Sequence, residues 1–179
     1  MIQVRFAGLG GQGIMLMGEI LGEAAVLEKK YVGQTSSYGS EARGSACRAD
    51  VVICESWIDY PEVTEADVLA CMSQGTYQQY AGRVNPSNGK IFLDSQLVKP
   101  DPSSPVKHIP VPASEKAFRE LGSRMVANMV LLGAVVKAVG LVSEDSLLQA
   151  LSRRLPPTLH DLNKRALALG FELALMEKI

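Results

Sequence analysis

The sequence is short of the residues that most often carry chemistry. Only three cysteines and two histidines occur among 179 residues. The cysteines, an odd number with no C-x-x-C pair, do not make a disulfide framework or the usual ligand set of a zinc site or iron–sulfur cluster. Their neighbours are apolar, so we expect buried thiols and no metal site at Cys47, Cys54 and Cys71.

Long hydrophobic runs and an excess of one charge are also missing. No apolar run approaches the roughly 18 residues that a membrane span needs, and the N-terminus lacks a signal-peptide pattern. The net charge is −1, from 18 basic and 19 acidic residues, which argues against a nucleic-acid binder. We expect a cytoplasmic protein, long enough for one domain with a substantial core.

Neither histidine has a catalytic neighbourhood. His108 falls in a proline-rich stretch and His160 lies close to the start of the last helix-like segment, away from any serine or cysteine motif of nucleophile type. We favour surface or packing roles for both, and we assign no catalytic residue to the chain.

The sequence does contain a cluster of glycines close to the N-terminus. Residues 2–13 read IQVRFAGLGGQG, and a helix-length apolar stretch, residues 14–27, follows at once. Strand, glycine turn and helix form the start of a nucleotide-binding βαβ unit, and Gly8, Gly10 and Gly13 fit the G-x-G-x-x-G spacing. Glycine permits positive φ and a close phosphate approach, and the N-terminus of the new helix attracts anions.

The acid that should hold the ribose of a dinucleotide is absent. Such a site carries Asp or Glu about 20 residues further on, at the end of the second strand. Here the second apolar run, residues 31–33, leads into Gln34-Thr35-Ser36-Ser37. The residues therefore disfavour NAD and permit a phosphate-bearing ligand. The alternative is that the glycines only form a tight turn from strand to helix.

Strand-like and helix-like segments alternate early in the chain, and helices follow one another after Pro112. The pattern predicts strands at residues 2–7, 30–33, 45–54, 67–72 and 90–94, and an edge strand at 106–109. It predicts helices at residues 14–27, 76–81, 114–121, 125–139, 143–155 (capped by Ser143) and 159–177. We expect a single-domain α/β fold. A doubly wound, mostly parallel Rossmann-like sheet would occupy about residues 1–112, with C-terminal helices of about residues 113–179 packed on it.

A second unusual stretch, residues 35–45, reads TSSYGSEARGS. We expect a polar loop after the second strand, at the carboxyl end of the sheet, where ligands bind in open α/β folds. Arg43 could make a bidentate contact to a carboxylate or phosphate, while Glu41 could hold Arg43 or meet a basic partner. The alternative is a solvated surface loop in which these two charges only pair with each other.

The chain resembles the gamma subunit of the 2-oxoacid:ferredoxin oxidoreductases. The resemblance lies in two motifs, Gly8-Leu9-Gly10-Gly11-Gln12-Gly13 and Ser37-Tyr38-Gly39-Ser40-Glu41-Ala42-Arg43-Gly44, and extends over the whole length, including Asp94. The second motif is most similar to the 2-oxoglutarate type, with the pyruvate and indolepyruvate types as close relatives. Ser45 departs from the pattern, since a second glycine is usual there.

The resemblance implies a subunit that is inactive alone. Its complex would oxidatively decarboxylate a 2-oxoacid to acyl-CoA and reduce ferredoxin, using thiamine diphosphate, Mg, iron–sulfur clusters and coenzyme A, none bound tightly by this chain alone. Alpha and beta subunits are the implied partners, with a delta subunit as a further candidate and ferredoxin reached through the complex. The gamma chain would support assembly and the coenzyme A site. Its implied cofactor-binding residues are Gly8, Gly10, Gly11, Gln12, Gly13, Ser37, Tyr38, Gly39, Glu41 and Arg43.

Several alternatives stay open. The substrate could be pyruvate, a branched-chain oxoacid or indolepyruvate, and the chain could instead be a stand-alone nucleotide-binding protein or a purely structural subunit. Trp57 and Tyr60 fit either a partner contact or a small satellite core under a loop. Apolar surface meant for partners could also produce a homodimer of the isolated chain.

Overall fold

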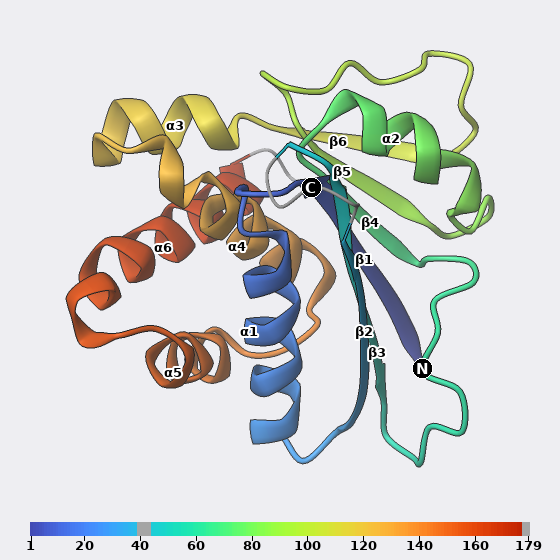
Figure 1. Ribbon diagram of the computed structural model, residues 1–179, viewed down its shortest axis with the longest axis horizontal. Helices are drawn as coiled ribbons and strands as arrows, with labels where there is room; N and C mark the ends of the chain where they lie inside the picture. Colours follow the sequence, from blue (N-terminus) through green and yellow to red (C-terminus); the bar gives the residue numbers. More distant parts are fainter. Residues whose placement is uncertain (39–43, 177–179) are drawn as a thin grey trace.

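A six-stranded sheet with helices on both faces organises the chain (Figure 1). The computed structural model describes residues 1–38 and 44–176. The strands are β1 (Ile2–Leu9), β2 (Tyr31–Tyr38), β3 (Ala46–Cys54), β4 (Val68–Cys71), β5 (Lys90–Asp94) and β6 (Lys107–Val111). The helices are α1 (Ile14–Leu27), α2 (Gln74–Tyr80), α3 (Ala113–Leu121), α4 (Ala127–Val139), α5 (Glu144–Arg154) and α6 (His160–Met176).

The strand order is β2-β3-β1-β4-β5-β6. β3 pairs antiparallel with β1 and β2, whereas β1, β4, β5 and β6 pair parallel with one another. Five of these strands therefore run in one direction, and only β3 opposes them. This arrangement confirms the predicted mostly parallel α/β sheet, and β6 is the edge strand that its proline-rich sequence predicts.

Two apolar layers lie on opposite faces of the sheet. α1, α4 and the other C-terminal helices cover one face, and α2 covers part of the other (Figure 1). Alternation along the strands sorts the side chains, so that Val4 and Phe6 face α1 while Ala7 faces α2. α5 packs on α1, and α6 packs on α4.

The nearly all-apolar α4 is explained by burial on every side. Its residues 127–136 are all buried, between the sheet, α3 and α6. A helix that is hydrophobic all round belongs in a core when it is too short for a bilayer. Among the residues that the structure describes, no helix combines the length and apolar character required to cross a membrane.

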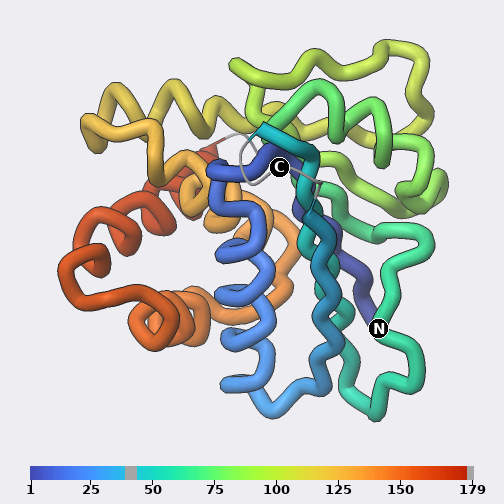
Figure 2. Tube along the Cα trace, viewed as in Figure 1, coloured from blue at the N-terminus to red at the C-terminus, as the bar shows by residue number. Residues whose placement is uncertain are grey.

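The second strand is longer than predicted, and this corrects the loop expected from residue 35. β2 extends to Tyr38 and pairs residue by residue with β3, from Tyr31 opposite Cys54 to Tyr38 opposite Cys47. Pairing with β3 along its full length overrides the weak strand preference of the Gln-Thr-Ser-Ser segment. Polar side chains are tolerated because β2 lies at an edge of the sheet. Figure 2 follows the chain from the end of α1 back into this strand.

Candidate functional site

The glycine turn joins β1 to α1 at the carboxyl end of the sheet. Gly11 and Gly13 have φ angles of 99° and 73°, which favour glycine, and Gly13 is the N-cap of α1. Gly13 also has no space for a side chain, because a Cβ there would lie 2.2 Å from Nδ2 of Asn128. Gly8 lies within β1 rather than in the turn, and its Cβ would come within 2.6 Å of Oε1 of Gln12. Backbone conformation and packing thus account for three of these glycines.

Gln12 braces the turn against the neighbouring strand. Its Oε1 accepts a hydrogen bond from the Leu9 N–H at 2.7 Å, and its Nε2 donates to the Met72 carbonyl at 2.8 Å. The carboxamide therefore ties the end of β1 to the end of β4. Among the predicted cofactor-binding residues that the structure describes, Gln12 has both polar side-chain atoms engaged by backbone groups of the protein itself.

The N-terminus of α1 has no neutralising side chain among the described residues. Gly13 offers no side-chain cap, and the first turn of α1 contains no acidic residue. The first N–H groups of a helix lack intrahelical partners and carry the positive end of its dipole. Since Gly11 is exposed and a Cβ there would meet nothing within 4 Å, the turn is open on its outer side. This geometry suits an anionic group such as a phosphate.

The second motif meets the first at this edge. The Gly10 N–H donates to the Ser45 carbonyl at 2.9 Å, and the Gly44 N–H donates to the Gly10 carbonyl at 3.4 Å. Ser37 and Tyr38 are exposed at the end of β2. Gly39, Glu41 and Arg43 lie outside the described residues. The structure therefore brings the flanks of the two motifs together.

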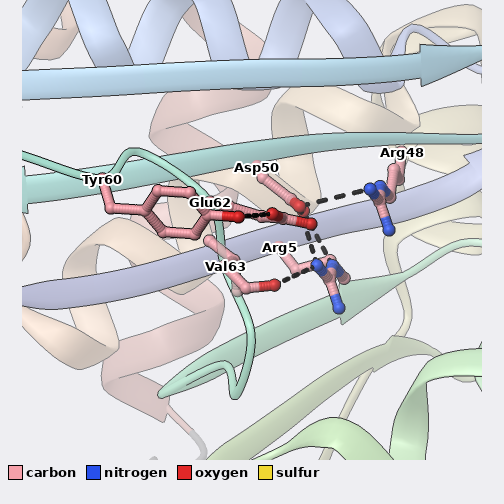
Figure 3. A network of polar contacts seen from close by, with 6 residues as sticks. All are labelled: Arg5, Arg48, Asp50, Tyr60, Glu62 and Val63. Atoms are coloured by element: carbon pink, nitrogen blue, oxygen red, sulfur yellow. Dashed lines mark hydrogen bonds and ion pairs between the residues drawn. The ribbon is translucent and has the colours of Figure 1, made fainter.

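A buried ion pair between β1 and β3 was missed by the sequence analysis. The Arg5 Nε and Nη2 donate to both carboxylate oxygens of Asp50 at 2.7 Å, and Nη2 also donates to the Val63 carbonyl (Figure 3). Arg48 adds a second cation 3.6 Å from Asp50. The Arg5 guanidinium lies 4.9 Å from the centroid of the Tyr80 ring, in the range of a cation–π contact.

This cluster is structural rather than reactive. Arg5 and Asp50 are 1% and 0% exposed, so no substrate reaches them. They occupy opposed positions in the register of β1 and β3. The available signal was Arg5 inside the first apolar strand and Asp50, with Arg48, inside the third, because a buried charge requires a partner.

Both histidines form hydrogen bonds with other groups of the protein. The His108 Nε2 lies 2.8 Å from the Tyr77 hydroxyl, and burial lowers the His108 pKa despite a hydrogen bond to Val106 and the charge of Asp101, which raise it. The His160 Nε2 donates to the Leu155 carbonyl at 2.8 Å.

Two of the three thiols are buried as expected. Cys47 and Cys71 are buried, Cys54 is half-buried, and burial raises the pKa of Cys71 to about 12. Across residues 1–38 and 44–176, no group of three or more His, Cys, Asp or Glu residues gathers as a possible metal site.

Trp57 and Tyr60 do not form a satellite core. Their side chains are 74% and 65% exposed. The small core under this segment is made instead by Val52, Val63 and Ala66, with Ile58 packed against it. The satellite-core alternative is therefore wrong for both aromatics, and a partner contact stays a prediction.

Comparison with known proteins agrees with the family resemblance drawn from the two motifs. The chain matches the family model described as pyruvate ferredoxin/flavodoxin oxidoreductase over residues 3–173. It is 38% identical to the 2-oxoglutarate synthase subunit KorC of Methanocaldococcus jannaschii, over 96% of this chain and 93% of that protein. It is 33% identical to the ketoisovalerate oxidoreductase subunit VorA of Methanothermobacter thermautotrophicus, over 97% of this chain but only 36% of that longer one.

A solved structure shares the whole fold. The gamma subunit of a keto/oxoacid ferredoxin oxidoreductase from Geobacter sulfurreducens superposes with a TM-score of 0.86 at 33% sequence identity. The match covers 98% of this chain and 99% of that one. The similarity thus includes the C-terminal helices as well as the sheet.

Proposed function

Because the chain belongs to the pyruvate ferredoxin/flavodoxin oxidoreductase family, we propose that it is the gamma-type subunit of a 2-oxoglutarate:ferredoxin oxidoreductase. The observation that carries this proposal is the 38% identity to KorC over almost the full length of both chains. Identity to the ketoisovalerate subunit VorA is lower, at 33%. The complex would convert a 2-oxoacid and coenzyme A to acyl-CoA and carbon dioxide, passing two electrons to ferredoxin. Among the relatives compared above, none supports a stand-alone nucleotide-binding protein.

The cofactors of the complex belong to this proposal too. Thiamine diphosphate with Mg would supply the decarboxylation chemistry, and iron–sulfur clusters would carry the electrons, on other subunits. In the described part of this chain the cysteines are scattered and offer no cluster ligand set. Alpha and beta subunits, with a delta subunit as a further candidate, are the partners we propose, in the cytoplasm.

The coenzyme A contribution of this chain would lie at the glycine turn. Gly8 at the end of β1 and Gly10, Gly11, Gln12 and Gly13 in the turn would line this site, and the uncapped N-terminus of α1 would attract a phosphate of the coenzyme. From the second motif we propose contributions of Ser37, Tyr38, Gly39, Glu41 and Arg43. Support comes from the hydrogen bonds that join Gly10 to Gly44 and Ser45 at the flanks of both motifs.

A charge introduced into the first turn of α1 tests this site. Met15 is half-buried in that turn, so Met15→Glu adds a negative charge to the first turn of α1, and Met15→Gln is the neutral control of similar shape. We expect Met15→Glu to raise the coenzyme A KM about tenfold, the scale of a helix-terminus charge effect, and Met15→Gln to leave it nearly unchanged. Arg43→Ala should raise the same KM. If both charge-changing variants assemble normally and keep the wild-type KM, the coenzyme A role of this chain is wrong.

Anaerobic affinity purification of the tagged chain from its host tests the function as a whole. The eluate would be assayed for coenzyme A-dependent reduction of a viologen dye with a panel of 2-oxoacids. We expect co-eluting thiamine-binding and cluster-bearing chains and activity with 2-oxoglutarate. Activity with pyruvate or a branched-chain oxoacid alone would keep the family and replace the substrate. A chain that elutes alone from cells with the activity would contradict the proposal.

A further inference from the structure

Residues 31–36 of β2, most of one edge of the sheet, have no role in the site described above. β2 pairs only with β3 among the described strands, so its other side is unpaired. Its eight residues, YVGQTSSY, include no charge and no proline. Edge strands of natural proteins normally carry such features because an unprotected edge is a template for another strand. The β2 edge is therefore suited to pairing with a strand from another chain.

A notch suited to a side chain opens beside this edge. Its volume is about 190 Å³, and it is lined by Tyr31, Val32, Gly33, Trp57, Ile58 and Pro61. Tyr31 and Trp57 meet edge to face with ring centroids 6.1 Å apart, although Trp57 stays 74% exposed. Gly33 lets the segment lie close to the strand, since a Cβ there would come within 2.4 Å of the Pro61 Cβ. Exposed aromatic side chains that line an apolar notch are typical of a protein–protein interface hot spot.

The segment that builds the notch is strongly acidic. Residues 55–65 contain four acidic residues and no basic one, and all four are exposed: Glu55, Asp59, Glu62 and Glu65. Within the described part of the chain none of the four forms an ion pair. Glu62 accepts a hydrogen bond from the Tyr60 hydroxyl (Figure 3). Charge complementarity at an interface then calls for Lys or Arg on the occupant.

We propose that β2 and residues 55–62 dock an extended segment of another subunit that carries one large apolar side chain and neighbouring Lys or Arg residues. Backbone hydrogen bonds extend the sheet beyond β2, the apolar side chain enters the notch, and a cation lies over Trp57 or against Asp59. The inference rests on the proposed function, because the occupant is a subunit of that complex.

A second copy of this chain fits less well. Pairing β2 with its own copy about a two-fold axis would supply no Lys or Arg from the paired strand, because β2 contains no charged residue. It would also bring two acidic segments together, which costs free energy. The chemistry of the notch and its rim therefore selects a basic, apolar partner strand.

Hydrogen–deuterium exchange on the purified complex and on the isolated chain tests the docking. We expect amides of residues 31–38 and 55–62 to exchange at least tenfold more slowly in the complex. Unchanged exchange of β2 in a complex that forms and is active overturns the inference and leaves the proposed function standing. Concentration-dependent protection of β2 in the isolated chain replaces the occupant by a second copy. Failure to form any complex overturns both proposals.

Two variants test separately the aromatic side chain beside the notch and the negative charge of the acidic segment. Trp57→Ala should weaken subunit association about 30-fold, the effect of an interface hot spot, and Asp59→Lys should weaken it further at low salt. Leu159→Ala, just before α6, and Asp161→Lys, in the first turn of α6, are controls at exposed positions, and they should bind like wild type. Thermal unfolding of the isolated variants should match wild type, since Trp57 is mostly exposed. Wild-type affinity of Trp57→Ala overturns the notch as the anchor.

Discussion

Arg5 and Asp50 show how one residue pair can fix the alignment of two strands. Each lies at the centre of an apolar strand, and their side chains form two hydrogen bonds of 2.7 Å. A slip of either strand by one residue would turn its charge to the opposite face, into the layer occupied by Val4 and Phe6. The pair therefore disfavours other registers of β1 and β3, and the Arg5 bond to the Val63 carbonyl holds the β3–β4 connection against the sheet.

Removing one partner should be far more damaging than removing both. Asp50→Leu leaves Arg5 charged, buried and without its carboxylate partner, so we expect a loss of about 3–5 kcal/mol in the free energy of unfolding. The double variant Arg5→Met, Asp50→Leu should recover most of that loss, because the fully buried charges are gone and only Arg48, whose side chain is 24% exposed, loses a partner. Urea unfolding followed by circular dichroism measures both. Equal destabilisation of the single and double variants would show that the charge is not the cause.

At the scale of elements, the crossing of α4 and α6 depends on two glycines. A Cβ on Gly170 would lie 2.2 Å from the Val130 carbonyl oxygen, and one on Gly133 would lie 2.4 Å from the Leu167 carbonyl oxygen. Both obstacles are backbone atoms, which cannot turn aside as a flexible side chain can. The two helices therefore approach as closely as their backbones permit.

A methyl group at this crossing should force the helices apart. We expect Gly170→Ala to lower the free energy of unfolding by about 3 kcal/mol, the upper range for overpacking, despite the better helix propensity of alanine. Gly75→Ala in α2 is the matched control, since its Cβ meets nothing within 4 Å and propensity alone should make it neutral or slightly stabilising. Differential scanning calorimetry measures the melting temperatures of both variants, and that of Gly170→Ala should be the lower. An unchanged melting temperature for Gly170→Ala would mean that the crossing can open without cost.

At the scale of the whole molecule, an ionised side chain connects the N-terminal half to the C-terminal helices. The Glu28 carboxylate, at the end of α1, accepts the Ser143 N–H at 2.6 Å and pairs with Lys30 at 3.0 Å. Burial raises its pKa, but the hydrogen bonds from Ser143 and Lys30 outweigh burial and lower the pKa to about 2. Glu28 thus holds the start of α5 against the end of α1.

Acid should weaken this connection in a defined range. Because the folded-state pKa of Glu28 is lowered from 4.5 to about 2, its stabilisation is present above pH 4.5 and is lost as the pH falls toward 2. We expect the free-energy difference between wild type and Glu28→Gln to be largest near neutral pH and to shrink between about pH 5 and pH 2. Urea unfolding at a series of pH values gives this difference, in which the other carboxylates cancel. A difference that does not change with pH would contradict the role of the charge.

The sequence by itself determined the class of fold and most element positions. Apolar periodicity predicted α1 at residues 14–27 and β5 at residues 90–94 with the bounds that the structure has. Ser143 caps α5 as predicted, accepting the Ser146 N–H. These features follow from local chemistry: side-chain period, glycine conformation and capping act within a few residues. The two motifs also identified the family, which the comparisons confirm.

Only the tertiary structure decided features that depend on distant residues. β2 continues to Tyr38 because β3 supplies its hydrogen-bond partners. Arg5 forms its ion pair with Asp50, a residue 45 positions away in the sequence. The brace from Gln12 to Met72 likewise joins strands that the sequence separates by 60 positions. The notch beside β2 exists because residues 57–61 fold back over Gly33. Pairings of this kind are set by the global packing of the chain, so no local pattern encodes them.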